Sequence, residues 1–146
     1  MFEVNREAPV VASTEVEIDA PPEVVWDIMT AIDRWPEWNP DIKTAALQGG
    51  LQEGSTFRWK TGPGTVVSTL REIDRPKRIA WTGRSLGVKA AHVWEIEPHN
   101  GGTLVRTEES WEGLPAKLFR KSSQKTVEKA LREGPHYLKA EAERRS

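Results

Sequence analysis

Cysteine is absent from this sequence of 146 residues. Without thiols there can be no disulfide, no thiolate metal ligand and no cysteine nucleophile, and the absence fits a reducing compartment. The three histidines, His92, His99 and His136, are not spaced as metal ligands. We therefore expect neither a metal site nor a bound cofactor, and a cytoplasmic location.

Long hydrophobic runs and a strong net charge are missing as well. No stretch approaches the length that spans a bilayer, and the first ten residues contain no apolar signal region. The net charge of −1 gives no global field that would attract nucleic acid or an anionic membrane. The length suits a single domain. We expect a soluble monomer or homodimer with neither a nucleic-acid partner nor integral membrane association.

Two common catalytic signatures are also missing. The glycines of Gly62-Pro63-Gly64 do not open a helix, so they are not a phosphate-binding loop. No Gly-x-Ser-x-Gly motif for a nucleophilic serine is present.

Tryptophan, in contrast, is abundant, with seven residues in this short chain. Trp59, Trp81 and Trp94 fall in the apolar phase of predicted strands. They either fill the core or line a site for a flat or aromatic ligand, to which an indole offers a large apolar surface. Arg58 and Lys60 flank Trp59 only on the opposite face, which disfavours a site for single-stranded nucleic acid.

The longest segment of uniform pattern is Pro115–Arg145, which predicts an amphipathic helix. Small residues, Ala116, Ser123 and Gly134, occupy the middle of its apolar face. Either another element packs closely against them or the helix covers a hollow. Pro135 removes a backbone donor, so we expect a bend after Gly134. The bulky members of the stripe are Phe119, Val127, Ala130, Leu131, Tyr137 and Leu138.

The remaining elements follow from periodicity and turn residues. Residues 1–12 are polar and irregular, which predicts a flexible arm, and the domain then covers residues 13–146. Alternation over Ser13–Asp19 predicts a strand, and two short helical segments follow up to Pro40. Six further strands are predicted at residues 42–47, 55–61, 65–73, 78–83, 88–97 and 103–111. The fold class is α+β, with an antiparallel sheet that curls around the C-terminal helix.

Several runs of the sequence resemble one known superfamily. They are "VEIDAPPEVVWDIMTAIDRWPEWNPDI", "GSTFRWK", "RIAWTGRSLGVKAAHVWEIEP" and "GGTLVRTEESWEG", followed by the closing helix. Together they resemble the START-like (SRPBCC) superfamily, specifically its polyketide cyclase/dehydrase and lipid-transport branch. The resemblance implies the helix-grip fold, a curved seven-stranded antiparallel sheet around the last helix, with a cavity for an apolar small molecule. Its members include cyclases, lipid carriers, hormone receptors and co-chaperones, so the fold does not select one activity.

One polar pair stands out among the predicted strands. In Val88–Glu97 the inward positions are apolar except for His92. If the following hairpin pairs Ile96 with Val105, His92 faces Glu109 on the same side of the sheet. The pair either orients or deprotonates a ligand in an apolar pocket, or it is a buried structural pair that satisfies itself.

We therefore predict a protein that binds a small apolar molecule, such as an aromatic, polyketide or lipid-like compound, between the sheet and the C-terminal helix. The loop from Gly83 to Gly87 is a candidate gate. One alternative is a cyclase or dehydratase with His92 and Glu109 as acid and base. Another is a co-chaperone-like module with a filled core and an exposed apolar patch. The predicted ligand contacts are Trp59, Trp81, His92, Trp94, Glu109, Trp111, Phe119, Ser123 and Val127.

Overall fold

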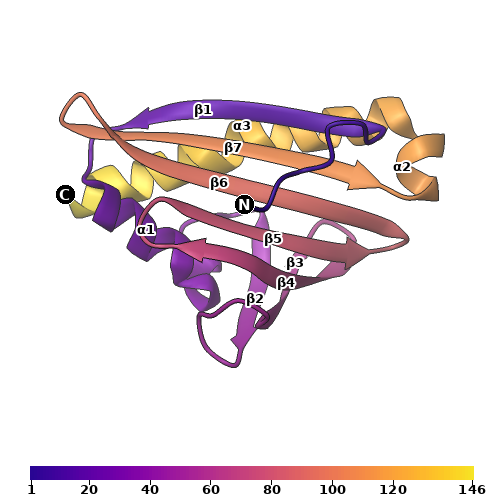
Figure 1. Cartoon of the computed structure of the whole chain (residues 1–146), viewed down its shortest axis with the longest axis horizontal. Helices are drawn as coiled ribbons and strands as arrows, with labels where there is room; N and C mark the ends of the chain where they lie inside the picture. Colours follow the sequence, from indigo (N-terminus) through magenta and orange to yellow (C-terminus); the bar gives the residue numbers. More distant parts are fainter.

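The computed structural model describes residues 1–146 and confirms the predicted order of elements. A strand is followed by two short helices, six strands and a C-terminal helical region (Figure 1). The elements are β1 (Val10–Ile18), α1 (Pro22–Thr30), the 3₁₀ helix η1 (Ile32–Glu37), β2 (Ile42–Gln48), β3 (Thr56–Thr61), β4 (Gly64–Asp74), β5 (Arg78–Ser85), β6 (Val88–His99), β7 (Gly102–Glu112), α2 (Leu114–Leu118) and α3 (Arg120–Arg145).

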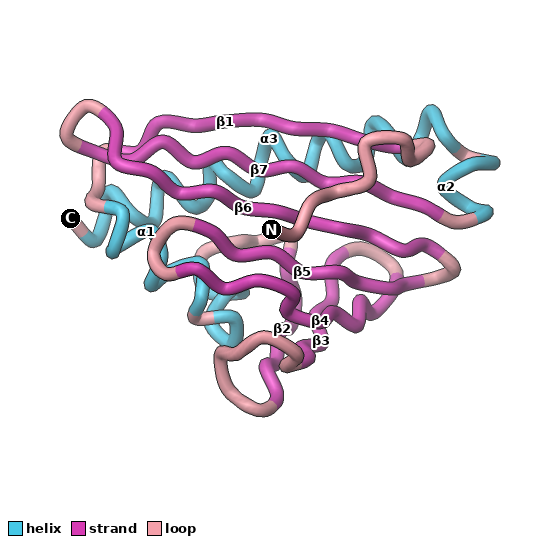
Figure 2. The backbone as a smooth tube through the Cα atoms, viewed as in Figure 1, coloured by secondary structure: helices cyan, strands magenta, loops and turns pink.

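The seven strands form one antiparallel sheet in the order β1-β7-β6-β5-β4-β3-β2. Strands β2 to β7 are sequential neighbours, and β1 closes the other edge beside β7. Helix α3 lies behind the sheet in Figures 1 and 2 and runs along β1 and β7. A curved antiparallel sheet with one apolar face covered by a long helix is the helix-grip architecture, so the predicted fold class is confirmed.

Helix α1 and η1 cover the remaining part of the inner face. Pro22 occupies the first turn of α1, where a missing N–H costs nothing, and Glu23 favours the positive end of the helix. The helix buries Trp26 and Met29 against the sheet. The indole N–H of Trp35 in η1 donates to the carbonyl of Met29 at 3.0 Å, which fixes η1 beside α1.

The C-terminal region differs from the single bent helix that the sequence predicts. The interruption falls at Phe119, which has φ −111° and ψ 45° and separates the short α2 from α3. Helix α3 then continues through Gly134 and Pro135 to Arg145. The sequence did not predict the break at Phe119; the expected bend at Pro135 is compatible with a helix that continues on both sides of it and stays a prediction.

The N-terminal segment also differs from the loosely held arm that we expected. Strand β1 begins at Val10, three residues earlier than predicted, and the preceding residues cross the outer face of the sheet (Figure 1). Val4 is 5% exposed and packs on Ala80 and Val93. The carbonyl of Phe2 accepts from the guanidinium of Arg78 at 2.6 Å. Side-chain burial thus attaches a segment whose composition alone suggested disorder.

The inner face is packed at both ends of α3 and opens between them. Leu138 and Ala142 belong to the main core with α1 and η1. Val127 and Leu131 pack in a smaller cluster with Val10, near the start of the helix. Val127 and Leu131 also border the cavity described next, together with Thr126 and the small residues Ala130 and Gly134 of α3.

Candidate functional site

A cavity of about 500 Å³ lies between the inner face of the sheet, η1 and α3. This volume is within the range of small-molecule binding sites. On α3, the lining residues Ala130 and Gly134 are small, and a Cβ added at Gly134 would meet no atom of another element within 4 Å. Of the predicted small-residue stripe, Gly134 thus borders a hollow, whereas Ala116 is fully buried by close packing with Val10 and Ser123 does not line the cavity.

Most of the predicted ligand contacts line this cavity, and two do not. Phe119 lies at the break between α2 and α3 with 65% of its surface exposed, and Ser123 precedes the part of α3 that borders the cavity. Both residues were expected to face the cavity because the sequence predicts one helix from Pro115 onwards, whereas the structure breaks that helix at Phe119. The predicted residues that line the cavity are Trp59, Trp81, His92, Trp94, Glu109, Trp111 and Val127. Their contact with a ligand stays a prediction.

Indole rings make up much of the wall. Six of the seven tryptophans line the cavity, including Trp35 and Trp38, which the sequence analysis did not include among the ligand contacts. Trp35 packs edge-on against Trp59, with ring centroids 5.5 Å apart. Trp35 lies inside η1 and Trp38 is its C-cap, and no periodic pattern in this short segment marks the two residues as part of a cavity wall.

The predicted pairing of β6 with β7 is confirmed residue by residue. Ile96 lies opposite Val105, and His92 lies opposite Glu109. Nδ1 of His92 is 3.5 Å from a carboxylate oxygen of Glu109, and Nε2 is 2.7 Å from the hydroxyl of Thr107. The second carboxylate oxygen of Glu109 accepts from the indole N–H of Trp111 at 2.8 Å.

The imidazole of His92 is buried between two indoles. Its ring centroid is 5.0 Å from that of Trp81 and 5.3 Å from that of Trp94. Burial lowers the pKa of His92, and the nearby carboxylate of Glu109 offsets this only in part. His92 is therefore neutral at pH 7. The geometry fits the tautomer in which Nδ1–H points to Glu109 and Nε2 accepts from Thr107.

Exposed lining residues mark the mouth of the cavity. They belong to the β3–β4 turn, the β5–β6 turn and the start of β2, and include Pro63, Leu86 and Asp41. The predicted gate is shorter than expected, because Gly83 and Ser85 are part of strand β5. The turn itself consists of Leu86 and Gly87, both with positive φ, which suits a two-residue hairpin. Movement of this turn stays a prediction.

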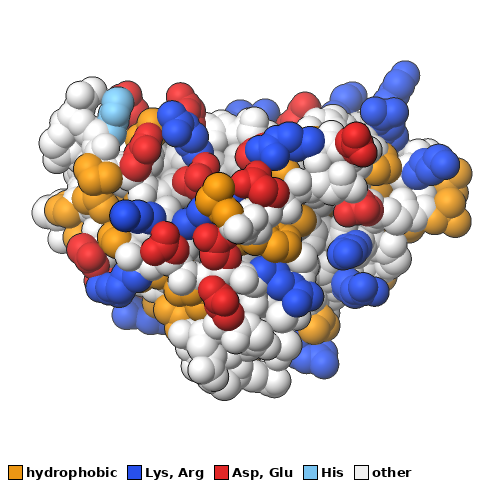
Figure 3. Space-filling view, viewed as in Figure 1, with side chains coloured by type: hydrophobic (Ala, Val, Ile, Leu, Met, Phe, Trp, Pro, Cys, Tyr) orange, Lys and Arg blue, Asp and Glu red, His pale blue; other side chains and the backbone are white.

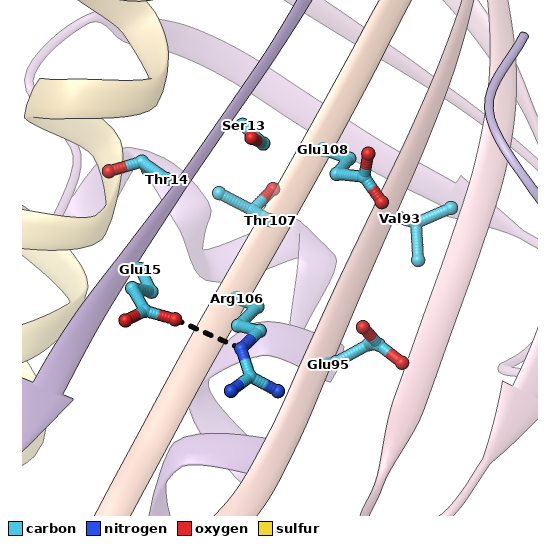
Figure 4. Close-up of a pocket in the computed structure, with 8 residues that line it drawn as sticks. All are labelled: Ser13, Thr14, Glu15, Val93, Glu95, Arg106, Thr107 and Glu108. Carbon is cyan, nitrogen blue, oxygen red and sulfur yellow. Dashed lines mark hydrogen bonds and ion pairs between the residues drawn. The ribbon is translucent and has the colours of Figure 1, made fainter. Parts of the chain in front are cut away.

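A second, smaller pocket of about 280 Å³ lies on the outer face of the sheet (Figure 4). Arg106 on β7 pairs there with Glu15 on β1 at 2.9 Å, and also with Glu97 at 3.4 Å. Val93 is the one hydrophobic residue in its lining. Acidic and basic side chains are interspersed over much of this face (Figure 3), and the acidic lining residues are paired with arginines, so we assign the pocket to a solvated sheet surface.

No group of three or more His, Asp or Glu residues is arranged to hold a metal ion. None of the helices contains an apolar stretch sufficient to cross a membrane.

The sequence matches the model of one protein family. The family is described as polyketide cyclase / dehydrase and lipid transport, and the match covers residues 9–143. The chain belongs to this family. A comparison with curated proteins finds no significant match.

Solved structures of similar proteins agree with the family assignment. A hypothetical protein from Helicobacter pylori superposes with a TM-score of 0.84 at 19% identity, covering 97% of each chain. A START superfamily protein from Mycobacterium smegmatis gives 0.75 at 18% identity, covering 93% of this chain and 99% of the other. The di-domain ARO/CYC StfQ from the steffimycin biosynthetic pathway gives 0.79 at 16% identity, covering 93% of this chain and 51% of the other. At these identities the likeness concerns the fold. Family and fold fit ligand binding or a cyclase-type role.

Proposed function

We propose that this protein binds a small, flat, largely apolar molecule, such as an aromatic polyketide, in the cavity between the sheet and α3. The observation that carries the proposal is a cavity of about 500 Å³ whose lining includes six indoles and the buried pair of His92 and Glu109. Indole faces offer large apolar contact areas at little cost in side-chain entropy, and few polar groups are needed to orient a ligand.

The indole N–H groups of the lining differ in what they can offer a ligand. Those of Trp38 and Trp94 are enclosed by protein atoms without a hydrogen-bond partner, so they are poorly placed to donate to a ligand. Protein acceptors already bind the N–H groups of Trp35, Trp59 and Trp111. Selectivity for flat rings then comes mainly from stacking, and His92 and Glu109 are candidates for the polar contact.

The test is a titration of the protein with flavonoids, aromatic polyketides and fatty acids, followed by intrinsic tryptophan fluorescence. We expect saturable quenching by a flat aromatic compound and a loss of affinity of at least about tenfold in Gly134→Leu, since a leucine would project into the cavity. Gly134→Ala is the matched control, because it adds only one methyl group at the same position. Quenching that is equal in wild type and Gly134→Leu would place binding elsewhere and reject the proposal.

A cyclase or dehydratase with His92 and Glu109 as acid and base is the second candidate. The position of both groups in the cavity wall favours it. Both ring nitrogens of His92 already have protein partners, however, and a base needs a free nitrogen within reach of the substrate. This candidate requires that His92→Ala abolish turnover of a bound polyketide while leaving its affinity largely intact. Equal loss of both would reject it.

A protein-binding module is the third candidate. It was expected to have a filled core, whereas the interior contains the cavity. Its other requirement, exposed apolar surface, is met at one end of the molecule, where Leu86, Leu114, Leu118 and Phe119 are more than half exposed. Replacing Leu118 and Phe119 together by serine separates the two functions, because the double variant should keep full affinity for the cavity ligand.

A further inference from the structure

The charges that line the cavity are of one sign. Asp41, at the mouth, and Glu109, in the wall, are its only acidic residues, and neither lysine nor arginine contributes to the lining. The basic residues of α3 point elsewhere, since the helix presents Thr126, Val127 and Ala130 to the cavity. A bound carboxylate would therefore find two negative charges and no cation.

The carboxylate of Glu109 lacks a cationic partner within the protein. Its side chain is 15% exposed, and its contacts are the N–H of Trp111 and the imidazole of His92. Because burial lowers the pKa of His92, the imidazole is neutral and supplies at most a weak hydrogen bond over 3.5 Å. A buried carboxylate is normally paired with a positive charge. No lysine or arginine of the cavity lining supplies that charge, so a cationic ligand can provide it.

The aromatic wall favours a cation in the cavity as well. Trp111 donates its indole N–H to Glu109, whereas Trp81 and Trp94 pack against His92. The faces of indoles attract ammonium groups, most strongly where the site is shielded from water. An ammonium group drawn to Glu109 would therefore lie in a cavity whose lining contains six indoles.

We propose that the cavity selects flat aromatic ligands that carry a protonated amine and rejects carboxylates of the same shape. This inference rests on the proposed function, because it specifies the charge of the molecule that the cavity binds. It narrows the ligand class from apolar compounds in general to aromatic amines, with fatty acids and aromatic acids excluded.

The experiment compares three ligands that share one ring system by isothermal titration calorimetry at pH 7. They are 2-(aminomethyl)naphthalene, which is a cation, 2-naphthalenemethanol, which is neutral, and 2-naphthoic acid, which is an anion. We expect the amine to bind about tenfold more tightly than the alcohol and the acid to bind most weakly. In Glu109→Gln, the preference for the amine over the alcohol should fall to about twofold or less. Glu108→Gln, with the same charge change on the outer face of the same strand, should retain the wild-type preference.

The outcomes separate the two levels of the argument. If the acid binds as tightly as the amine in wild type, the cavity function stands and the charge selection is overturned. If Glu108→Gln and Glu109→Gln reduce the preference equally, the effect is one of net charge, and the role of Glu109 is overturned. If none of the three ligands binds, the proposed function fails and the charge selection fails with it.

Discussion

Arg78 and Glu109 lie on opposite faces of the same sheet, and each is a largely buried charged residue. The guanidinium of Arg78 is 7% exposed and is bound by the carboxylates of Glu3, Glu72 and Glu95, together with the carbonyl of Phe2. The carboxylate of Glu109 is 15% exposed, but its neighbours are an indole and a neutral imidazole. One charge is neutralised by the protein, whereas the other is not.

This difference leads us to propose a structural role for the first charge and a binding role for the second. A buried charge with its full set of partners stabilises the fold only while the set is complete, and it has nothing left to offer a ligand. A buried charge beside a cavity without a counter-charge stabilises the fold little and retains its capacity to bind. Under the proposed function, the outer face is a scaffold and the inner face carries the binding site.

The largest expected effect is that of Arg78→Met. It leaves Glu72 half-buried without its cation and frees the carbonyl of Phe2, so the free energy of unfolding should fall by about 2–4 kcal/mol. Denaturation with urea measures the change. Arg106→Met, which removes exposed pairs on the same face, should cost less than about 1 kcal/mol. Equal losses in the two variants would remove the distinction between buried and exposed charges.

His92 should make stability depend on pH. Its pKa in the folded state lies below the unperturbed 6.5, because burial disfavours the charged ring. Well above pH 6.5 the ring is neutral in both the folded and the unfolded protein and does not change the free energy of unfolding. As the pH falls through 6.5 towards the folded-state pKa, the unfolded chain takes up the proton first, so stability falls by up to about 1.4 kcal/mol per pH unit.

The measurement is urea denaturation of wild type and His92→Gln at pH 7.5 and pH 5.5. Wild type should lose about 1 kcal/mol more than the variant between these two values. His136→Gln, at an exposed position on α3, is the control and should follow wild type. The same pH dependence in all three proteins would show that His92 is not the group responsible.

Glu109→Gln should change the free energy of unfolding by less than about 1 kcal/mol, in contrast to Arg78→Met. The amide keeps an acceptor for Trp111 and removes a buried charge that has no counter-charge. Thermal and urea denaturation at pH 7 give the value. A loss as large as that of Arg78→Met would mean that Glu109 is structural.

Gly134→Ala is expected to have the smallest effect, a change in the free energy of unfolding of less than about 0.5 kcal/mol. Alanine favours the helix over glycine, but a Cβ on the residue before Pro135 crowds the proline ring, and the two effects oppose each other. Thermal denaturation should show a nearly unchanged midpoint with unchanged ligand affinity. A loss of more than about 1 kcal/mol would indicate that the cavity is filled at this position in solution.

The sequence was sufficient for the order of the strands and for the register of β6 with β7. Alternation in β6 and the turn at Asn100-Gly101 together fix which residues face each other, and this placed His92 opposite Glu109. The register shifts between β2 and β3 and between β4 and β5 interrupt the period of two, and the sequence did not predict them.

The sequence was insufficient where long-range packing decides. The break at Phe119 and the packing of Val4 on the outer face have no periodic signal, since both depend on what the rest of the chain places beside them. For the same reason the sequence alone could not decide between a cavity beside the small residues of the C-terminal helix and close packing against them. Small residues on α3 fit close packing and a hollow equally well until the opposite wall is known.

A crystal structure of the protein with 2-(aminomethyl)naphthalene tests the central claim most directly. The account predicts that the ring lies between the indoles of the cavity and that the ammonium nitrogen is about 3 Å from the carboxylate of Glu109. A ring bound on the outer face, or a cavity closed by the side chains of α3, would contradict it.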